Sequence, residues 1–356
     1  MTLQLYIKVF CLALLAFPQL TIGSPNQIMS RIIGGTTSEG NRWPWMAGLV
    51  TKNSPATEGL FCGASLIAKD WVLTAGHCVF DQSPGTFEVV INQAQLDANT
   101  GERSAVERIV IHPLYDNSTL DNDLALIKLK SASQVQPIQL VAPYSNQDIP
   151  NKPAIALGWG AVHPSKALFP LDLRQADLPL ISNSACSASM NEPISDNLLC
   201  AGDGLGLRDT CSGDSGGPLI VFDTESHSWR QAGITSWGFG CAKVESYGVY
   251  TRLKNYAVFI SNQICSAQEA PISSSLKLNI NANIVSLNWT SASSTEGYRL
   301  NYAPYPNAQH IDSADMNLLT DFSAELASGS AYYVAITSYK NNCLSDYSNI
   351  EHFVIP

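Results

Sequence analysis

The stretch DTCSGDSGGP, residues 209–218, decides what fold and chemistry the chain can have. It places one serine, Ser215, among three glycines and directly after an aspartate. A serine hydroxyl is a poor nucleophile until a positioned base takes its proton, and a histidine held by a buried carboxylate is the usual base. If Ser215 is a nucleophile, the rest of the sequence must supply one such histidine and one such aspartate.

Two other segments supply these partners. His77 lies in WVLTAGHCV (71–79), where an apolar strand runs into Ala-Gly-His-Cys, whereas the remaining histidines lie in loops or turns without such a frame. Asp123 stands at the mouth of the apolar strand in LDNDLALIKL (120–129), where a hydrogen bond to an imidazole would offset its burial. Asp121 is the rival carboxylate, and its position favours an exposed turn.

Composition limits the size of the protein and its partners. With 356 residues, 45% of them hydrophobic and 14% charged, the chain can bury sizeable cores and favours two folded units. The formal net charge is −10 and no block of lysine or arginine is present. This balance argues against a nucleic-acid partner or an anionic membrane surface.

Residues 1–23 have the layout of a secretory signal peptide, with Lys8, an apolar run at 9–17, then Pro18 and small residues. The run is too short to cross a bilayer, so we expect a secreted, extracellular protein without a membrane span. Cys11 lies inside the run, and we interpret it as discarded with the signal peptide rather than as a lipid-anchor site. Removing it from the nine cysteines leaves eight, and this even number predicts four disulfides.

Short runs of Val, Ile, Leu and aromatic residues, separated by Gly, Pro, Asn and Ser turns, extend from Arg31 to about Ser266. This all-β pattern predicts an antiparallel barrel or sandwich. Helical spacing of apolar residues at 255–264 predicts a short closing α-helix. Residues 267–275 are polar and indicate a linker, and alternating runs at 276–356 predict a second, smaller β domain.

Seven blocks occur in the order and spacing of the chymotrypsin-like, trypsin-type serine proteases. They are RIIGG (31–35), WVLTAGHC (71–78), DNDLALIKL (121–129), GWG (158–160), DTCSGDSGGP (209–218), ITSWGFGCA (234–242) and GVYTRL (248–253). The chain resembles this family from residue 32 to about 265. The resemblance implies a double six-stranded antiparallel β-barrel with a short closing α-helix, and we expect this protease domain to occupy residues 32–266.

The resemblance also implies a catalytic triad in the cleft between the barrels. In it, His77 is the general base and acid, Asp123 orients and stabilises the imidazolium, and Ser215 is the nucleophile. The oxyanion hole is implied to be the backbone N–H groups of Gly213 and Ser215. Glycines suit the tight turn that aims two N–H groups at one point, because a Cβ would obstruct it.

Activation by cleavage is a further implication of the resemblance. In this family, cleavage before an isoleucine frees an α-amino group that is buried against the aspartate preceding the serine. Here that cleavage follows Arg31 and frees Ile32, Asp214 is the buried partner, and residues 24–31 are a propeptide. Self-activation and activation by another protease both stay open.

Substrate preference follows from Asp209, which stands six residues before Ser215 where the family places the base of its primary pocket. Gly238 and Gly248 occupy the wall positions where small residues admit a long side chain. A carboxylate in this place implies cleavage after Arg or Lys, because the substrate cation would form charge-assisted hydrogen bonds with it. The alternative is that Asp209 is an ordinary solvated loop residue.

No cofactor is implied, and we expect no firmly bound metal. Tyr247 stands where trypsin itself has proline, and a tyrosine there accompanies sodium-sensitive enzymes in the family, so sodium dependence stays open. Residues 92–103 fall where many trypsins bind calcium through paired glutamates. They offer Asp97 and Glu102 at unmatched spacing, whereas calcium needs several converging oxygens.

The family pattern implies three of the disulfides: Cys62 with Cys78, Cys186 with Cys200, and Cys211 with Cys241. A further bridge common in the family is missing as a unit, since Ala154 and Val221 occupy its two positions. Cys265 and Cys343 then have no other partners. We predict that these two pair and join the domains, with two free thiols as the alternative.

The C-terminal segment resembles a fibronectin type III or immunoglobulin-like sandwich, with Trp289 in an early strand and YRLNY at 298–302. Leu326 and Tyr332 have the spacing of the tyrosine corner of such domains. Trypsin-type proteases with a C-terminal sandwich resemble secreted bacterial proteases, in which a sorting tail often follows. Here we expect no anchoring tail.

These observations favour a secreted, zymogen-activated serine endopeptidase that acts on polypeptides with Arg or Lys at the cleaved position. Protein protease inhibitors are expected partners, and the protein is expected to be a monomer. The alternative is a catalytically inactive homologue that acts as a binding or adhesion protein. In a third reading the C-terminal domain binds an extracellular partner, such as carbohydrate or matrix. Sequons at Asn117 and Asn288 matter only in a glycosylating host.

Overall fold

The computed structural model describes residues 33–98, 100–143, 146–163, 166, 168–265, 271–308 and 310–356. The predicted signal peptide, the propeptide with Arg31, and Ile32 lie outside these residues, as does the first part of the predicted linker. Within the described residues, no helix is both long and apolar enough to cross a membrane.

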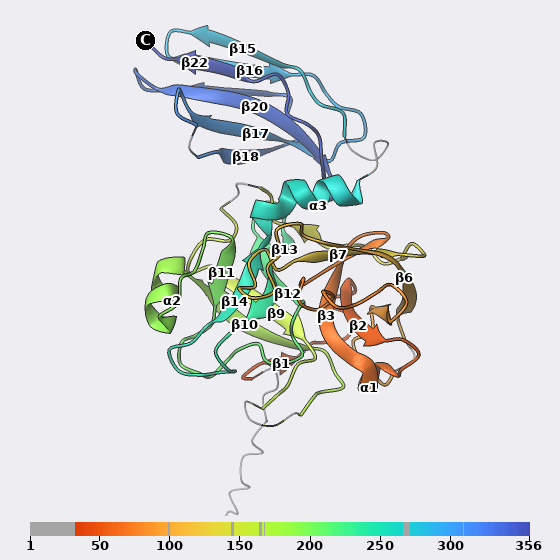
Figure 1. The fold of residues 1–356 in the computed structure, drawn as a ribbon. Helices are drawn as coiled ribbons and strands as arrows, with labels where there is room; N and C mark the ends of the chain where they lie inside the picture. The colour runs from red at the N-terminus through yellow and green to blue at the C-terminus, as the bar shows by residue number, and fades with distance from the viewer. Residues whose placement is uncertain are drawn as a thin grey trace, which may run out of the picture.

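The first barrel is a closed ring of six antiparallel strands, joined in the order β2-β3-β4-β7-β6-β5 (Figure 1). Its strands are β2 (Met46–Thr51), β3 (Leu60–Ala68), β4 (Trp71–Thr74), β5 (Phe87–Ile91), β6 (Glu102–Ile111) and β7 (Ala125–Leu129). The short helix α1 (Ala56–Gly59) lies between β2 and β3. Strand β4 ends at Thr74, so His77 follows it directly.

The second barrel closes in the order β9-β10-β11-β14-β13-β12 and back to β9. Its strands are β9 (Pro153–Gly158), β10 (Arg174–Ile181), β11 (Leu198–Ala201), β12 (Pro218–Asp223), β13 (Ser228–Trp237) and β14 (Gly248–Arg252). Strand β1 (Thr36–Thr37) pairs with β10, and β8 (Gln139–Leu140), from the connector between the barrels, pairs in parallel with β13. The fold-class prediction of a double six-stranded barrel is confirmed.

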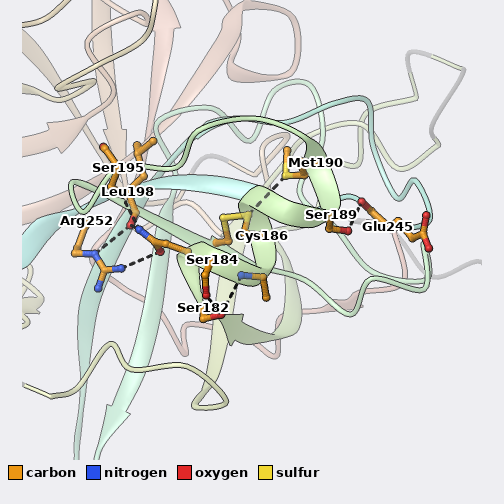
Figure 2. Close-up of a disulfide and its surroundings, with 12 residues drawn as sticks. Ser182, Ser184, Cys186, Ser189, Met190, Ser195, Leu198, Glu245 and Arg252 are labelled. Carbon is orange, nitrogen blue, oxygen red and sulfur yellow. Dashed lines mark hydrogen bonds between the residues drawn. A yellow bond between two sulfur atoms is a disulfide. The ribbon is translucent and has the colours of Figure 1, made fainter.

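Two helices follow strands of the second barrel in the chain, α2 after β10 and α3 after β14. Helix α2 (Asn183–Met190) begins at Ser182, whose hydroxyl accepts a hydrogen bond from the Ala185 N–H at 3.2 Å and so satisfies one free donor of the first turn (Figure 2). The predicted closing helix is α3 (Ala257–Ile264), which follows the 3-10 turn η1 (Leu253–Tyr256).

The alternation in β10 shows why these segments form barrel strands. Its burial follows a period of two, with Ala176, Leu178 and Leu180 buried and Asp177 exposed. One continuous cluster of buried apolar side chains runs through both barrels. Burying each large aliphatic side chain contributes roughly 1.5–3 kcal/mol, so this shared core holds the two barrels in one fixed arrangement.

A two-sheet β-sandwich follows the two barrels (Figure 1). One sheet has the order β15 (Leu276–Asn281), β16 (Ile284–Trp289) and β19 (Asp321–Glu325). The other contains β18 (Asp312–Asn317), β17 (Gly297–Pro304) and β20 (Ala331–Lys340), with β21 (Cys343–Leu344) and β22 (Glu351–Val354) both paired to β20. Its core is separate from that of the barrels, as expected for a second folded unit.

The tyrosine corner is not formed as expected. Leu326 and Tyr332 do pack against the sandwich core. However, the Tyr332 hydroxyl makes no hydrogen bond to any described residue, and its ring instead meets Tyr302 edge-on at 6.1 Å. The hydroxyl that does bond to the backbone is that of Tyr298, which accepts from the Ala292 N–H at 2.7 Å and packs against Trp289.

All four predicted disulfides are present. Cys62 pairs with Cys78, Cys186 with Cys200, Cys211 with Cys241, and Cys265 with Cys343. The alternative of two free thiols at the last pair is therefore wrong. In the loop-entropy view, closing loops with sequence separations of 14 to 78 stabilises the folded state by about 3–4.5 kcal/mol each. The Cys265–Cys343 bridge joins the end of α3 to the sandwich.

The two positions of the missing family bridge, Ala154 and Val221, lie next to each other in the structure. Ala154 in β9 and Val221 in β12 are directly opposite each other in the antiparallel ladder, and both are buried. Opposed strand residues have Cβ atoms about 4.5–5.5 Å apart, so a small adjustment would bring two cysteines to bonding distance.

We therefore predict that the double variant Ala154→Cys/Val221→Cys forms a fifth disulfide. Its unfolding should require more denaturant than that of the parent, with a gain of up to about 4 kcal/mol for a loop of this length. Thiol titration under denaturing conditions checks the bond, with Ala154→Cys alone as the control that retains one free thiol. Two titratable thiols in the double variant would contradict the prediction.

Candidate active site

His77, in the segment after β4, and Asp123, in the segment before β7, contact each other. His77 Nδ1 lies 2.8 Å from Asp123 Oδ2, and the His77 backbone N–H donates to Asp123 Oδ1 at 2.9 Å. Asp123 is completely buried, whereas 23% of the His77 side chain is exposed. The carboxylate thus fixes the Nδ1 edge of the imidazole, while part of the ring keeps access to the surface.

The second barrel supplies two further contacts to Asp123. The Ser236 hydroxyl donates to Asp123 Oδ2 at 2.5 Å, and the Thr251 hydroxyl donates to the Asp123 carbonyl oxygen at 2.7 Å. The sequence reasoning missed both residues. They lie inside the family-like blocks ITSWGFGCA and GVYTRL, so the signal was present, but their partner was not visible from the sequence. These bonds tie the two barrels together at the site.

Ser215 lies on the loop before β12, pressed against the segment that carries His77. The Gly63 N–H of β3 donates to the Ser215 carbonyl oxygen at 2.8 Å. Gly216 has φ +77°, and a Cβ there would lie 2.2 Å from Thr74 Oγ1 and 3.2 Å from the Ala75 nitrogen. Only glycine allows this approach. The Ser215 hydroxyl makes no hydrogen bond to a described residue, as is common at catalytic groups without bound substrate.

The N–H groups of Gly213 and Ser215 are available for a ligand. Neither donates to another group among the described residues, whereas the Asp214 N–H between them donates to the Cys211 carbonyl at 2.9 Å. Gly213 has φ +94°, a conformation that favours glycine. The turn therefore leaves two N–H donors beside the serine, as an oxyanion hole requires.

Asp214 is a completely buried carboxylate. Its two oxygens accept hydrogen bonds from the Gly160 N–H and the Cys211 N–H, each at 2.8 Å. No cationic side chain among the described residues contacts it. Burial raises the pKa of Asp214 to about 7, because the charged form has lost its water and the two N–H donors only partly compensate.

A pocket of about 260 Å³ opens beside Ser215, with Asp209 among its lining residues. Its wall is formed by Thr210, Cys211, Ser212, Thr235, Ser236, Trp237, Gly238, Gly240, Cys241 and Gly248. Gly248 lies close to Tyr250 and to the pocket residue Asp209, since a Cβ there would lie 2.9 Å from the Tyr250 hydroxyl and 3.2 Å from Asp209 Oδ1. At Gly238 a Cβ would meet nothing closer than 3.7 Å, so no steric contact demands glycine there.

Asp209 is only 5% exposed, so the interpretation of it as a solvated loop residue is wrong. Oδ2 accepts from the Ala242 N–H at 2.9 Å, but the buried Oδ1 has no partner among the described residues. Burial raises the pKa of Asp209 to about 6. A buried acceptor without a donor is costly, and it marks the place where a ligand cation would bind most favourably.

The possible metal positions have other partners. Cys62, His77 and Cys78 are the one group of ligand-type side chains that converge among the described residues, and both sulfurs belong to a disulfide. Glu102 lies in β6, where its Oε1 accepts from the Gln134 N–H at 3.0 Å. Tyr247 packs beside Gly202 and Gly204.

The fold and this arrangement define a class: a two-barrel serine-hydrolase scaffold with a His–Asp pair beside a glycine-fenced serine. The Trypsin family model matches residues 32–260. Serine protease 1 of Homo sapiens is 33% identical over 263 residues, which cover 72% of this chain and 98% of that protein. The chain belongs to the trypsin family of serine proteases.

Two further relatives agree with this assignment. Trypsin-3 of Salmo salar is 34% identical over 239 residues, covering 66% of this chain and 94% of that protein. Transmembrane protease serine 7 of Rattus norvegicus is 33% identical over 249 residues, covering 67% of this chain but 29% of that longer protein. All of these similarities leave at least a quarter of the chain unmatched.

The raised pKa of Asp209 predicts a stability change in Asp209→Asn. Between the ordinary aspartate pKa of 3.8 and about 6, the folded protein binds more protons than the unfolded chain, so this group lowers the free energy of unfolding as pH rises through that window. The penalty above pH 6 corresponds to about 3 kcal/mol. Denaturant unfolding should find the variant similar to the parent near pH 4 and more stable at pH 7.5, unlike the exposed control Asp321→Asn.

Proposed function

We propose that this protein is a secreted serine endopeptidase that hydrolyses peptide bonds after Arg or Lys and is made as an inactive zymogen. The observation that carries the proposal is the buried Asp123–His77 pair, with its 2.8 Å contact, at the barrel junction against the Ser215 loop. Membership of the trypsin family supports it. The inactive-homologue alternative is disfavoured, because His77, Asp123, Ser215 and Gly213 all have the residue types that catalysis needs.

In the proposed reaction, the Ser215 hydroxyl oxygen attacks the substrate carbonyl carbon while His77 Nε2 takes the hydroxyl proton. Asp123 holds the other ring nitrogen and stabilises the imidazolium. The N–H groups of Gly213 and Ser215 bind the oxyanion, and each such donor contributes about a hundred- to a thousand-fold in rate. His77 returns its proton to the leaving amine, which leaves an acyl-enzyme. Water activated by His77 then hydrolyses the ester and restores the serine.

Preference for Arg or Lys is supported by the partnerless oxygen of Asp209 at the pocket wall. A substrate guanidinium or ammonium would supply the missing donor and a compensating charge, and would lower the raised pKa of the carboxylate. An apolar side chain would leave the carboxylate buried without a partner. Protein inhibitors that present Arg or Lys would bind in the same way.

Zymogen control is supported by the surroundings of Asp214. This buried carboxylate has two N–H donors but no cation, and a buried ion pair is favourable only when complete. The Asp209 N–H donates to the Ile33 carbonyl at 3.1 Å, which brings the start of the described chain beside the pocket. The α-amino group of Ile32, freed by cleavage after Arg31, would complete the pair and fix the turn that carries the oxyanion hole.

The proposed organisation is a signal peptide at 1–23, a propeptide at 24–31, the protease domain at 32–266, a linker at 267–275 and a sandwich at 276–356. We further propose that the sandwich is of the fibronectin type III or immunoglobulin-like kind. Its two antiparallel sheets support this assignment: β15, β16 and β19 form one, and β18, β17 and β20 form the other, with β21 and β22 both paired to β20. An extracellular ligand for this domain stays a proposal.

Hydrolysis of chromogenic peptides ending in Arg, Lys, Phe or Ala tests the function. We expect turnover of the Arg and Lys peptides only after limited cleavage at Arg31. Ser215→Ala should lower kcat by about a million-fold, as loss of a triad member typically does. Asp209→Asn should retain the triad but lose the preference for basic over apolar peptides.

The zymogen step has its own test. Asp214→Asn keeps an acceptor for one backbone N–H but cannot form an ion pair, so the cleaved variant should stay as inactive as the uncleaved parent. Full activity in that variant would refute the activation mechanism without touching the triad. Absence of turnover in the parent protein with a free Ile32 amino group would instead favour the inactive homologue.

A further inference from the structure

The sandwich contacts the protease barrels through the turn between β20 and β21. Cys343 is bonded to Cys265 at the end of α3, and the Leu344 N–H donates to the Ser261 hydroxyl on the same helix at 3.0 Å. Asn342, the residue before the disulfide, reaches past the helix into the protease barrels. The turn is therefore held covalently at the place where Asn342 must sit.

Asn342 uses three hydrogen bonds to clamp two separate segments of the protease. Its Nδ2 donates to the Ile67 carbonyl of β3 at 2.7 Å and to the Ile138 carbonyl of the inter-barrel connector at 3.0 Å. Its Oδ1 accepts from the Leu140 N–H of β8 at 2.8 Å. Ile67, Ile138 and Leu140 are all buried, and a buried backbone group that loses its hydrogen-bond partner is costly. A residue of the sandwich thus completes the hydrogen bonding of the barrel junction.

One clamped segment leads to the nucleophile. Ile67 lies near the end of β3, four residues after Gly63, whose N–H donates to the Ser215 carbonyl at 2.8 Å. The Gly63 carbonyl also accepts from the Thr74 hydroxyl at 2.9 Å, just before the His77 segment. Strand β3 belongs to the first barrel and Ser215 to the second. The Gly63–Ser215 hydrogen bond therefore positions the serine loop of one barrel against a strand of the other.

The other clamped segment leads to Asp123. Leu140 of β8 pairs with Gln231 of β13, and the Val141 N–H donates to the Gln231 carbonyl at 2.9 Å. Strand β13 continues to Ser236, which donates to Asp123 at 2.5 Å. The Ser65 hydroxyl of β3 also donates to Gln231 Oε1 at 2.6 Å, which joins the two segments between the clamp and the site.

We propose that Asn342 is a positioning residue for the proteolytic reaction: from the sandwich, it fixes β3 against the connector and β13 and so sets the placement of Ser215 relative to His77 and Asp123. This rests on the proposed function. Of the two cross-barrel contacts at the site, Gly63 to Ser215 lies on β3, which Asn342 contacts directly at Ile67. The other, Ser236 to Asp123, lies on β13, which Asn342 reaches through the pairing of β8 with Gln231. The sandwich is then part of the catalytic unit rather than an appended binding module.

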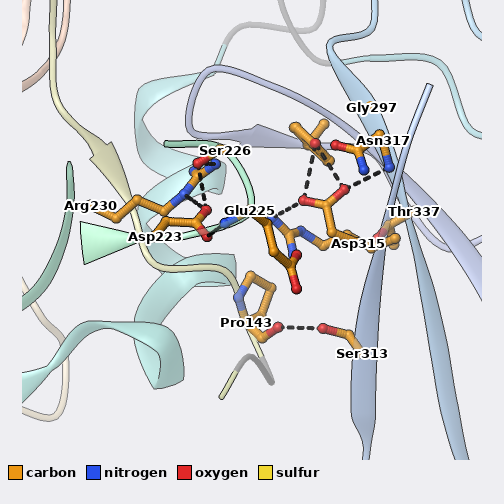
Figure 3. A network of polar contacts seen from close by, with 12 residues as sticks. Pro143, Asp223, Glu225, Ser226, Arg230, Gly297, Ser313, Asp315, Asn317 and Thr337 are labelled. Atoms are coloured by element: carbon orange, nitrogen blue, oxygen red, sulfur yellow. Dashed lines mark hydrogen bonds and ion pairs between the residues drawn. The ribbon is translucent and has the colours of Figure 1, made fainter. Parts of the chain in front are cut away.

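The other contacts between the sandwich and the protease domain do not reach both β3 and the connector. The Ser313 hydroxyl donates to the Pro143 carbonyl at 2.9 Å, and Figure 3 shows this bond apart from the ion pair of Asp223 and Arg230 on the protease. Asp315 lies in the sandwich, where it pairs with Arg299. Of these three contacts, only the Ser313–Pro143 hydrogen bond crosses between the two parts, and it reaches the connector alone. Among the hydrogen bonds that join described residues of the sandwich to the protease domain, only those of Asn342 reach β3.

The test compares Asn342→Ala and the milder Asn342→Ser with the matched control Asn349→Ala, all in the full chain after cleavage at Arg31. Asn349 makes a similar pair of bonds, to both the N–H and the carbonyl of Leu276, but inside the sandwich. An acylating titrant counts working sites. Per titrated site, Asn342→Ala should lower kcat for an Arg peptide about three- to thirtyfold. KM should change less than twofold, because Asp209, which would bind the substrate cation, lies on neither β3 nor β13.

Asn342→Ser retains one donor and should fall between Asn342→Ala and the parent, while Asn349→Ala should keep the parental kcat. Equal kcat per titrated site in all variants would overturn the inference, as would an equal loss in Asn349→Ala. If Asn342→Ala does not fold, Asn342→Ser against the parent decides by the same criterion.

Amide hydrogen exchange gives a second readout that needs no turnover. Asn342→Ala should speed exchange in 61–67 and 231–237 as well as at Leu140, whereas Asn349→Ala should speed exchange only within the sandwich. An increase confined to Leu140 and the sandwich would overturn the inference. An inactive parent would refute the proposed function, and the exchange comparison would still decide whether the clamp reaches the strands that hold the site.

Discussion

The buried carboxylate of Asp123 is the constraint on which the rest of the structure depends. An ionised carboxylate without water is several kcal/mol unfavourable unless donors surround it. Two of its donor groups come from His77 in the first barrel and one comes from Ser236 in the second. The barrels must therefore dock in one register, and that register is also the one that places the Ser215 loop beside His77. The docking of the barrels that satisfies Asp123 is therefore the same docking that assembles the site.

Three buried aspartates at the site differ in how far their surroundings satisfy them. Asp123 has donors on both oxygens. Asp214 also has a donor on each oxygen but no cation, and burial raises its pKa to about 7. Asp209 has one oxygen without any donor, and its pKa is raised to about 6. Asp209 and Asp214 are thus buried carboxylates whose charged forms are unfavourable, and a positive group that bound to either would relieve this cost. Binding of such a group can therefore stabilise the ordered form of the segments around these residues.

Much of the fold and of the candidate site could be predicted from the sequence, because the patterns that indicate them involve residues close together in the chain. Runs of period two gave the strands, helical spacing gave α3, and glycines around Ser215 indicated a turn that no other residue tolerates. Pairings between distant segments could not be predicted in this way. Ser236, Thr251 and Asn342 look like ordinary strand or turn residues, and asparagine is common in turns for purely local reasons. The same limit applies to Tyr332, whose spacing suggested a hydrogen bond that packing against Tyr302 replaces.

The bridge between Cys265 and Cys343 gives the chain a second covalent route around the linker. Residues 266–275, SAQEAPISSS, contain no lysine or arginine, so an enzyme with the proposed preference has no cleavage point there in another copy of itself. A different protease that nicked this segment would leave both parts in one molecule, because the sulfur–sulfur bond spans the break. The connection between the two domains is therefore redundant, and only reduction combined with cleavage would separate them.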